Sequence, residues 1–319
     1  CYVITFASLG QILIKKRELK IKLPRNMRVI PFPLLINGMQ ILVAIPLSTI
    51  VAIIALILVD LKKIDLIYAR SSFLSFGFLA IKYLSQRTVV KIHSIMEDEI
   101  PYGGIRSIIG MFAHFLDRLA LAKARRIIVD NKLFYNVLIK HRSFKHRYPP
   151  IIVPPGVDLH LIEKIKKEGS TSTQRNTINI GFVGLLAWWQ GVHILVAAIS
   201  LLSKKISNLK LIIIGDGKLR SIIEKMCREL NVNYEITGFL PHKEALKRFA
   251  ELDVLVLPSI RTTTTNFNIP MKVIEAWALE VPVITTDHTI FGYYRVKNFR
   301  DVIYCRPEPS NVAKAMYLL

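Results

Sequence analysis

The chain is short of cysteine, glycine and proline, and each shortage excludes a class of protein. Three cysteines in 319 residues, far apart in the sequence, cannot form the disulfide framework of a small secreted domain, and they favour a reducing compartment. Glycine and proline, 15 residues each, are too few for a fibrous repeat or a disordered chain. With 52% hydrophobic residues, the chain can form one large domain or two medium domains with cores of their own.

Acidic residues are also scarce, since 23 Asp and Glu stand against 44 Lys and Arg, which gives a net charge of +21. The first 153 residues hold 23 of the basic and 8 of the acidic side chains, so the excess belongs mainly to that half. Such a charge predicts an anionic partner: a nucleic acid, a membrane surface or a phosphorylated substrate. The strongest local patch, KHRSFKHR at 140–147, matches no nucleic-acid-binding motif, and we expect no nucleic-acid partner.

Charge is absent altogether from residues 29–59, and the second part of this run predicts a hydrophobic helix at about 39–59. Three interpretations stay open: a helix that spans the bilayer, a buried core helix of an α/β domain, or a monotopic helix that enters one leaflet beside flanking Lys and Arg. Pro46 interrupts the run, and both flanks are basic, which gives no orientation bias. We expect a cytoplasmic protein that is peripheral or monotopic at the cytoplasmic face of an anionic membrane.

Short β-branched runs alternate with helical stretches along the chain. In the second half we expect strands at 178–184, 209–214, 233–238, 253–257 and 281–286, and helices at 192–204, 218–230, 242–251, 270–279 and 310–319. In the first half we expect strands near 64–68, 87–93, 125–129 and 150–153, and helices near 73–84, 107–122 and 132–140. This alternation predicts an α/β protein with mostly parallel, doubly wound sheets.

The same pattern predicts two Rossmann-like domains whose strand ends border a common cleft. We expect the N-terminal domain at 1–155, a polar linker at 156–177 and the C-terminal domain at 178–319. The chain begins with Cys1 inside an expected strand, CYVITFAS, which predicts a truncated start.

Two glycine turns follow expected strands in the second half. The loop from Gly184 to Gly191 leads into a helix, and such a turn presents backbone N–H groups and the positive helix end to an anion. Three interpretations of Trp188 and Trp189 in this loop stay open: they pack between the domains, face a sugar or anchor the loop. The second turn, GDG at 215–217, allows a tight bend before the next helix, which Asp216 can cap.

The segment PMKVIEAWAL at 270–279 carries the sharpest chemical signal. Pro270 suits the first position of a helix. Lys272 then falls in the first turn, where the helix dipole disfavours a cation unless an anion such as a diphosphate docks there. Glu275 follows on the same short helix, near enough for its carboxylate to accept hydrogen bonds from ligand hydroxyls.

The ordered set of motifs resembles glycosyltransferase family 4, whose members are retaining, nucleotide-sugar-dependent enzymes of GT-B fold. The resemblance covers roughly residues 60–319. It rests on the two glycine turns together with IDLIYARSSFLS (64–75), VVKIHSIMEDE (89–99), RIIVDN (126–131), IIVPPGVD (151–158), ITGFLPHKEALKRFAELDVLVLPS (236–259) and PMKVIEAWALEVPVITT (270–286). It implies that two Rossmann-like doubly wound domains face a central cleft, with the acceptor on the N-terminal side and the nucleotide sugar on the C-terminal side. The family continues before Cys1 and beyond Leu319, so we expect both ends to be truncated.

The resemblance implies roles for individual residues. Glu275 matches the second Glu of the family's E-x7-E motif, which holds the donor ribose, and His93 matches a histidine that faces the transferred sugar; these are the expected catalytic residues. The amides that receive the donor diphosphate correspond to Pro270–Lys272. The remaining expected donor-binding residues are Gly184, Gln190 and Gly191 in the glycine loop, Met271 in the helix, and Leu240 and His242 in the loop that contacts the nucleotide base.

The sequence departs from the family at three donor-site positions. Phe267 stands where the first Glu of E-x7-E falls, and Leu185 and Gln190 stand where an Arg and a Lys usually flank the donor phosphates. In other enzymes, one hydrogen-bond donor that stabilises the charge developing in the transition state lowers the activation free energy by roughly 2.7–4 kcal/mol. The candidates to supply the lost positive charge are Arg70, Arg261 and Lys272.

These features predict a retaining glycosyltransferase that moves a sugar from a nucleotide sugar to a lipid-linked glycan or lipid phosphate at the membrane. We expect no cofactor besides the nucleotide-sugar co-substrate and no metal, because the chain lacks an Asp-x-Asp triplet and Glu97–Glu99 reads as a solvated loop. Two alternatives stay open. One is a nucleotide-sugar 2-epimerase, which needs further acids and histidines. The other is a non-catalytic, degenerate nucleotide-sugar-binding protein at the membrane, which the three departures favour.

Overall fold

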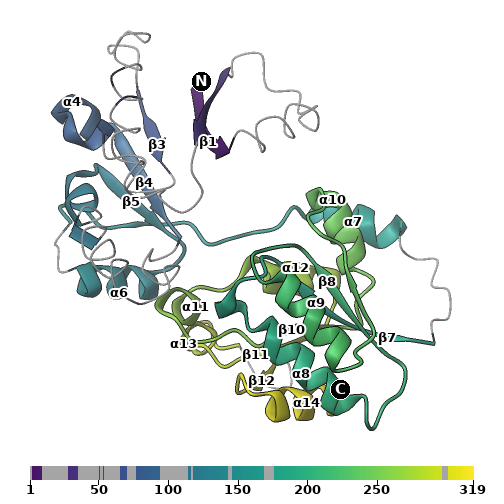
Figure 1. Ribbon diagram of the computed structural model, residues 1–319. Coiled ribbons are helices and arrows are strands. Elements are labelled where there is room, and N and C mark those ends of the chain that lie inside the picture. The colour runs from purple at the N-terminus through teal and green to yellow at the C-terminus, as the bar shows by residue number, and fades with distance from the viewer. Residues whose placement is uncertain are drawn as a thin grey trace. The chain divides into compact units, whose positions relative to one another are not determined.

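Figure 1 shows a computed structural model of the chain. It describes residues 2–8, 28–34, 50, 53, 65–69, 77–93, 114–115, 118–142, 146–168, 176–296 and 301–319. The chain divides into two compact units. One comprises Cys1–Ile92, Ile100–Ile128 and Arg142–Pro149, and the other comprises His93–Glu99, Val129–His141 and Pro150–Leu319.

The second unit is built on a six-stranded sheet in which all neighbouring strands run parallel. Its strands are β7 (Ile178–Val183), β8 (Leu209–Ile214), β9 (Tyr234–Ile236), β10 (Val254–Leu257), β11 (Val283–Thr286) and β12 (Ile303–Cys305). They lie in the order β12-β11-β10-β7-β8-β9. This is the doubly wound order: β8 and β9 are added on one side of β7, and β10, β11 and β12 are added on the other side, so the strand order reverses between β7 and β10. The predicted α/β class and the five strands expected in this half are confirmed.

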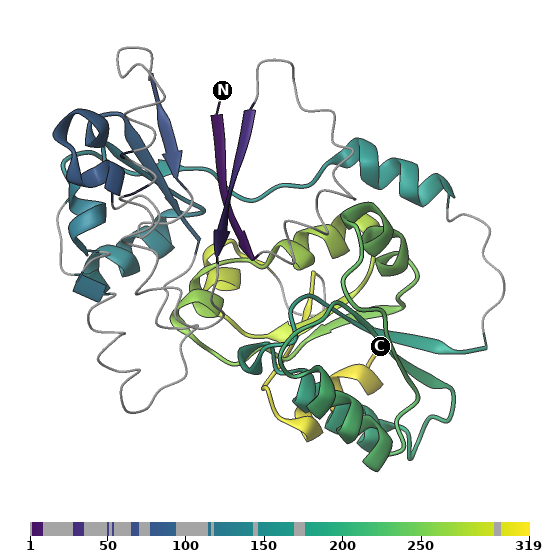
Figure 2. The ribbon, with the colours of Figure 1, turned by 45° about the horizontal axis from the view of Figure 1, so that its top comes forward.

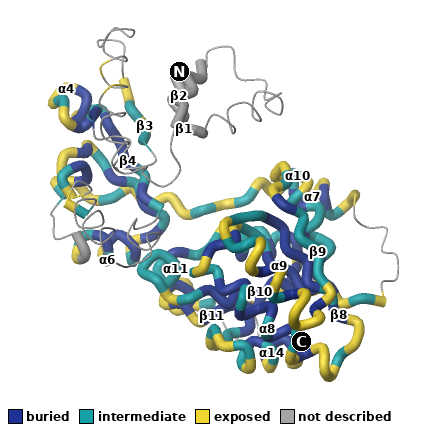
Figure 3. The backbone as a smooth tube through the Cα atoms, in the orientation of Figure 1, coloured by how far each residue is buried: buried dark blue, intermediate teal, exposed yellow. Residues whose placement is uncertain are grey.

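Helices cover both faces of this sheet (Figures 1 and 2). On one side α8 (Val192–Leu202) packs against α9 (Arg220–Glu229) and α14 (Pro309–Tyr317), and on the other α7 (Leu159–Glu168), α10 (His242–Phe249) and α12 (Met271–Leu279) pack together. Figure 3 shows the central strands between them as the buried layer, and β10, with the sequence VLVL, is buried at every position. The edge strand β9 is only partly buried. The five helices predicted in this half are confirmed, and most of their ends agree with the prediction to within about two residues. Assignments of helix ends normally differ by this much.

Several short helices and one short strand were not predicted from the sequence. Among them are the 3-10 turn η3 (Trp188–Gln190), α11 (Thr263–Phe267), α13 (Thr289–Tyr293) and β12, each of which spans five residues or fewer. Such segments are too short to show a hydrophobic period. The ten-residue helix α7 lies inside the range expected to be a linker, and it buries Ile162 and Ile165. The domain boundaries themselves stay predictions.

A second parallel sheet has four strands in the order β3-β4-β5-β6. These are β3 (Ile67–Ala69), β4 (Thr88–Ile92), β5 (Arg126–Val129) and β6 (Ile151–Ile152), accompanied by α4 (Lys82–Ser85) and α6 (Lys132–Arg142). Thr88, Val89, Val90 and Ile92 of β4 are all buried, which is typical of a strand covered on both faces. The four strands predicted in this half are confirmed.

The first strand of the chain forms a separate parallel pair, β1 (Tyr2–Ser8) with β2 (Arg28–Leu34). The strand read from CYVITFAS is confirmed. The strand β2 was not predicted, because RVIPFPL contains Pro31 and Pro33, and proline cannot donate a ladder hydrogen bond.

The predicted hydrophobic helix at 39–59 lies outside the described residues except for two helical positions, Ile50 and Ile53, which are about half exposed. Arg70 and Glu97–Glu99 also lie outside them. Within the described part of the chain, no helix has both the length and the apolar character needed to cross a bilayer.

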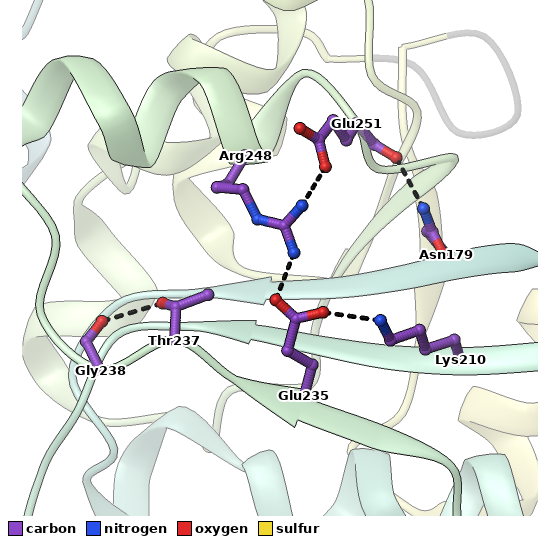
Figure 4. Close-up of polar contacts among 7 residues, drawn as sticks. All are labelled: Asn179, Lys210, Glu235, Thr237, Gly238, Arg248 and Glu251. Atoms are coloured by element: carbon purple, nitrogen blue, oxygen red, sulfur yellow. Dashed lines mark hydrogen bonds and ion pairs between the residues drawn. The ribbon is translucent and has the colours of Figure 1, made fainter. Parts of the chain in front are cut away.

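A chain of polar contacts fixes β9 and α10 to their neighbours (Figure 4). Lys210 on β8 donates from Nζ to Oε2 of Glu235 on β9 over 2.6 Å. The Arg248 guanidinium on α10 binds both Glu235 and Glu251. The hydrogen bond from Lys210, aided by Arg248, lowers the pKa of Glu235 below its usual range. The network therefore holds both elements that flank the loop at residues 237–241.

Candidate functional site

The candidate site lies at the carboxyl ends of β7 and β10, where the strand order reverses. Ligands of doubly wound sheets bind in the crevice outside the strand ends at such a point. Gly184 follows β7 directly, and Pro258 follows β10 directly. The backbone N–H of Ile260 donates to the carbonyl oxygen of Trp189 over 2.9 Å, so the loops after the two strands are joined.

Two glycines make the close approaches in this loop possible. Gly191 has φ of +71°, and a Cβ there would lie 2.0 Å from the carbonyl oxygen of Pro258. Gly184 has φ of +131°, and a Cβ there would lie 2.9 Å from Nζ of Lys272. Both backbone conformations are unfavourable for residues with side chains. The predicted glycine loop is therefore a tight loop that brings the end of β7 next to the first turn of α12.

Lys272 is the cation of this site. Its Nζ donates to Oε1 of Gln190 over 2.8 Å and lies 4.5 Å from the centroid of the Phe182 ring. Burial lowers the pKa of Lys272 to about 7, although the nearby Glu275 carboxylate acts in the opposite direction. A bound anion would stabilise the charged form.

The helix α12 begins at Met271, with Pro270 as its N-cap, so the prediction that Pro270 takes the first helical position is wrong by one residue. Pro270 has an extended backbone with φ of −63° and ψ of 137°, which places it just before the first turn. Met271 and Lys272 occupy that turn, where backbone amides have no acceptor within the helix. These amides and Lys272 together make an anion-binding end.

Glu275 lies one turn further along α12, with its side chain 13% exposed. Its Oε1 is 2.9 Å from Nε2 of His242, the first residue of α10, whose side chain is 67% exposed. Leu240, in the loop before α10, is partly buried against the core. The structure therefore brings the residues expected at the ribose and the base to one place, through a His–Glu contact that the sequence did not reveal.

His93 follows β4, with its side chain 35% exposed. Its Nδ1 lies 3.3 Å from Oδ2 of Asp130, and its backbone carbonyl accepts a hydrogen bond from Nδ2 of Asn268 over 2.9 Å. Asn131 donates to the Phe267 carbonyl oxygen over 2.9 Å and to Oδ1 of Asn268 over 3.1 Å. The two asparagines that make these hydrogen bonds are buried: Asn131 is 2% exposed and Asn268 is 9% exposed.

Nothing in the sequence marked these two asparagines, because a buried amide and an exposed one look alike in a single sequence. Phe267, which stands where the family has a glutamate, ends α11 three residues before Pro270. Its backbone carbonyl accepts the hydrogen bond from Asn131. The structure therefore offers no carboxylate at this position.

Of the other expected cations, Arg70 lies outside the described residues. Arg261 binds the backbone carbonyl of Asp287, and it lines a pocket of about 770 Å³ together with Arg306 and Lys314 but not with Lys272. Leu185, in the position of the family's arginine, is 47% exposed. The role of Arg261 at a phosphate stays a prediction.

A buried Ser–His contact lies beside the site and was also not predicted. Oγ of Ser259, after β10, is 2.9 Å from Nε2 of His288, after β11. Burial lowers the pKa of His288 to about 4, and Arg261 adds to this effect, so the imidazole is neutral at pH 7. The contact ties two neighbouring loops together. Among the described residues, no group of three or more His, Cys, Asp and Glu side chains could hold a metal ion.

The second half of the sequence is similar to a known protein family. Residues 177–319 match the model of the family described as Glycosyl transferases group 1. Two uncharacterized glycosyltransferases of Methanocaldococcus jannaschii are similar to the chain. One is 27% identical over 166 residues, covering 50% of the chain and 39% of the relative. The other is 26% identical over 238 residues, covering 72% and 59%. The chain thus spans less than two thirds of the length of either relative.

Solved structures are similar over almost the whole chain. HepE of Anabaena, crystallised in complex with UDP and glucose, superposes with a TM-score of 0.70 at 17% identity, covering 99% of this chain and 81% of HepE. Sucrose-phosphate synthase of Thermosynechococcus elongatus gives the same TM-score at 16% identity, covering 93% and 75%. The fold is therefore GT-B, as predicted. The sequence match to the group 1 glycosyl transferases covers residues 177–319, which is less than half of the chain.

Proposed function

We propose that the chain is part of a retaining glycosyltransferase of family 4, which transfers a sugar from a nucleoside diphosphate sugar to an acceptor. The observation that carries this proposal is the first part of α12. Within a few residues it combines the backbone amides of the first helical turn, the Lys272 ammonium and the Glu275 carboxylate beside the glycine loop. Amides and a cation suit a diphosphate, and a carboxylate suits the hydroxyls of a ribose.

In this proposal the donor binds to residues 178–319. The diphosphate lies at the first turn of α12, with Lys272 against its oxygens and the Gly184 backbone alongside. The ribose hydroxyls donate to Glu275, whose partner His242 leaves Oε2 for them. The base lies against the loop that contains Leu240. The UDP complex of HepE supports a nucleotide donor for this fold.

The transfer step forms a bond between an acceptor oxygen and the anomeric carbon of the donor sugar. It breaks the bond from that carbon to the diphosphate, which leaves with the bonding electron pair. The acceptor proton passes to a departing diphosphate oxygen, and the new bond forms on the face that the diphosphate leaves. His93, held by Asp130 through Nδ1, orients the sugar. Amides and Lys272 stabilise the charge that develops on the leaving group.

We further propose that the acceptor is a lipid-linked glycan or lipid phosphate, bound by the N-terminal domain at the cytoplasmic membrane face. The support is the charge of the first 153 residues, 23 basic against 8 acidic, next to the uncharged run at 29–59. Lys and Arg attract anionic lipid surfaces. We expect the chain to float with liposomes that contain anionic lipid. Absence of binding with and without anionic lipid would remove this proposal.

The donor part of the proposal is tested by thermal-shift screening with UDP-, GDP- and ADP-sugars in the presence of EDTA. We expect one nucleotide class to raise the melting temperature, the shift to vanish in Glu275→Ala, and chelation to have no effect, since no metal is required. Glu229→Ala, a change at an exposed glutamate on α9, is the matched control and should keep the shift. If a nucleotide sugar still raises the melting temperature of Glu275→Ala, the assignment of Glu275 to the donor site is wrong.

A second function is favoured by Phe267, Leu185 and Gln190, which remove a carboxylate and two cations from the family's pattern. A protein with this site could bind a nucleotide sugar without turning it over. Release of free nucleoside diphosphate separates the two. Release that depends on added lipid acceptor supports transfer, and donor binding without any release selects the non-catalytic function. Release without acceptor, or a change of the sugar while it stays on the nucleotide, points to hydrolysis or epimerisation.

A further inference from the structure

Gln190 and Lys272 meet although they are 82 positions apart in the sequence. Gln190 is the last residue of η3, and Lys272 lies in the first turn of α12. Oε1 of Gln190 is 2.8 Å from Nζ of Lys272. An ammonium group only donates hydrogen bonds, so the carbonyl end of the Gln190 amide must face it.

The backbone around Gln190 is fixed independently of this contact. The N–H of Gln190 donates to the Ala187 carbonyl oxygen over 3.0 Å, and the N–H of Gly191 donates to the Trp188 carbonyl oxygen over 3.3 Å. Gly191, with φ of +71°, then turns the chain into α8. Gln190 thus projects from a rigid turn, and its amide reaches Lys272 from a fixed starting point.

Besides Gln190, the groups closest to the ammonium are uncharged, and the Glu275 carboxylate interacts with it electrostatically. The Phe182 ring lies on one side, with its centroid 4.5 Å from Nζ, and the Gly184 backbone lies on another. Lysine has a flexible four-carbon stem, and a defined position for its ammonium needs an anchor. An amide is the suitable anchor at a phosphate site. A carboxylate would neutralise the ammonium, and a second cation would repel it.

We propose that Gln190 is a positioning residue of the donor site, which holds the Lys272 ammonium at the first turn of α12 and leaves its positive charge available to the donor phosphates. This rests on the proposed function, since it presumes that Lys272 binds the donor. It also assigns a role to the substitution at Gln190. The neutral residue anchors the remaining cation where the family pattern has a second one.

The test is a double-mutant cycle with Gln190→Met and Lys272→Met, read as the donor dissociation constant of the full chain with the nucleotide sugar that gives the thermal shift. Methionine keeps the length and apolar stem of glutamine but cannot accept the hydrogen bond. We expect Gln190→Met to weaken donor binding about fivefold to tenfold, which is less than the loss of a direct hydrogen bond to a charged group, because Gln190 acts on the donor through Lys272. In the Lys272→Met background the same change should have almost no effect, because the anchored group is gone.

Two further variants make the result specific. Gln190→Glu keeps an acceptor but adds a negative charge, so it should move the pH at which donor binding is lost to a higher value, which a purely structural role would not do. Gln86→Met repeats the substitution at an exposed glutamine and should leave donor binding unchanged. Should Gln190→Met fail to fold, as its melting curve would show, Gln190→Asn removes the contact by shortening the side chain.

The outcomes separate this inference from the proposed function. Normal donor binding by Lys272→Met overturns the proposed site and this inference with it. Weak binding by Lys272→Met with normal binding by Gln190→Met overturns only the positioning role. Equal effects of Gln190→Met in both backgrounds also overturn it, since Gln190 would then act on the donor without Lys272.

Discussion

Nε2 of His242 and Oε1 of Glu275 lie 2.9 Å apart, which joins the first residue of α10 to the second turn of α12. The two helices pack side by side on one face of the six-stranded sheet. Glu275 is mostly buried, whereas His242 is mostly exposed. The carboxylate expected at the donor ribose is therefore already oriented before a ligand binds, and the histidine is the group that orients it.

This contact predicts a graded effect of two substitutions on donor binding. Glu275→Ala removes the acceptor of the ribose hydroxyls and should weaken donor binding by about 10- to 100-fold, the range for hydrogen bonds to a charged group. His242→Ala leaves the carboxylate in place and should weaken it less, about threefold to tenfold. Titration calorimetry measures both. A larger loss in His242→Ala than in Glu275→Ala would contradict the assigned roles.

Lys272 predicts a rise in stability with pH. Its pKa is about 7 in the folded chain, against an ordinary value of 10.5, so the unfolded chain binds more protons between these values. The free energy of unfolding contributed by this group therefore increases from pH 7 to about 10.5. The groups nearest the ammonium are Glu275, with its partner His242, on α12 and α10, and the uncharged Phe182 and Gln190 on β7 and η3.

Urea unfolding of the chain and of Lys272→Met at pH 6, 8 and 10 isolates this contribution. The difference in unfolding free energy between the two proteins should change with pH in favour of the unsubstituted chain as pH rises. A difference that stays constant over this range would show that Lys272 keeps an ordinary pKa.

Gly191 predicts a steric effect on stability. A Cβ at this position would lie 2.0 Å from the Pro258 carbonyl oxygen, and φ is +71°. Gly191→Ala must therefore strain the backbone and move the loop after β10, at a cost of about 2 kcal/mol or more of unfolding free energy. Gly156→Ala is the control, because a Cβ there meets no atom within 4 Å. Equal melting temperatures for the two variants would show that Gly191 does not lie against the Pro258 carbonyl group.

The Glu235 network predicts a loss of stability in acid. The pKa of Glu235 is lowered in the folded chain, chiefly by the hydrogen bond from Lys210, so its contribution is present above pH 4.5 and disappears as pH falls through the lowered value. Lys210→Met should lose about 1 kcal/mol at pH 7 and less at pH 3. Lys225→Met, which alters an exposed pair with Glu229, should change little at either pH. The reverse order of effects would exclude the network as a stabilising element.

Much of the fold could be predicted from the sequence because strand and helix periods are local. Runs such as KLIII before GDG at 215–217, and the apolar stripes of α9 and α12, each carry their own signal over eight or more residues. Short elements such as α11 and α13 carry no such signal. In β2, two prolines argued against a strand, and pairing with β1 outweighed them.

Individual residues of the site could be predicted from the sequence, but the contacts between them could not. Glycines, Lys272 and Glu275 stand in recognisable motifs, but the contacts among them join distant positions. Gln190 with Lys272 and Asn131 with Asn268 are separated by 82 and 137 positions. Their meeting depends on the strand order β10-β7-β8 and on packing that a single sequence does not display. The role of Gln190 as an anchor followed only from the structure.

The first part of α12 is proposed to bind the diphosphate and ribose of a nucleotide donor. Titration calorimetry of the full chain with UDP, GDP and ADP, repeated with Lys272→Met and Glu275→Ala, measures this binding. We expect saturable binding of one of these nucleotides and a loss of affinity of about tenfold or more in each variant. Binding that is unchanged in both variants, or no binding of any of the three, would contradict it.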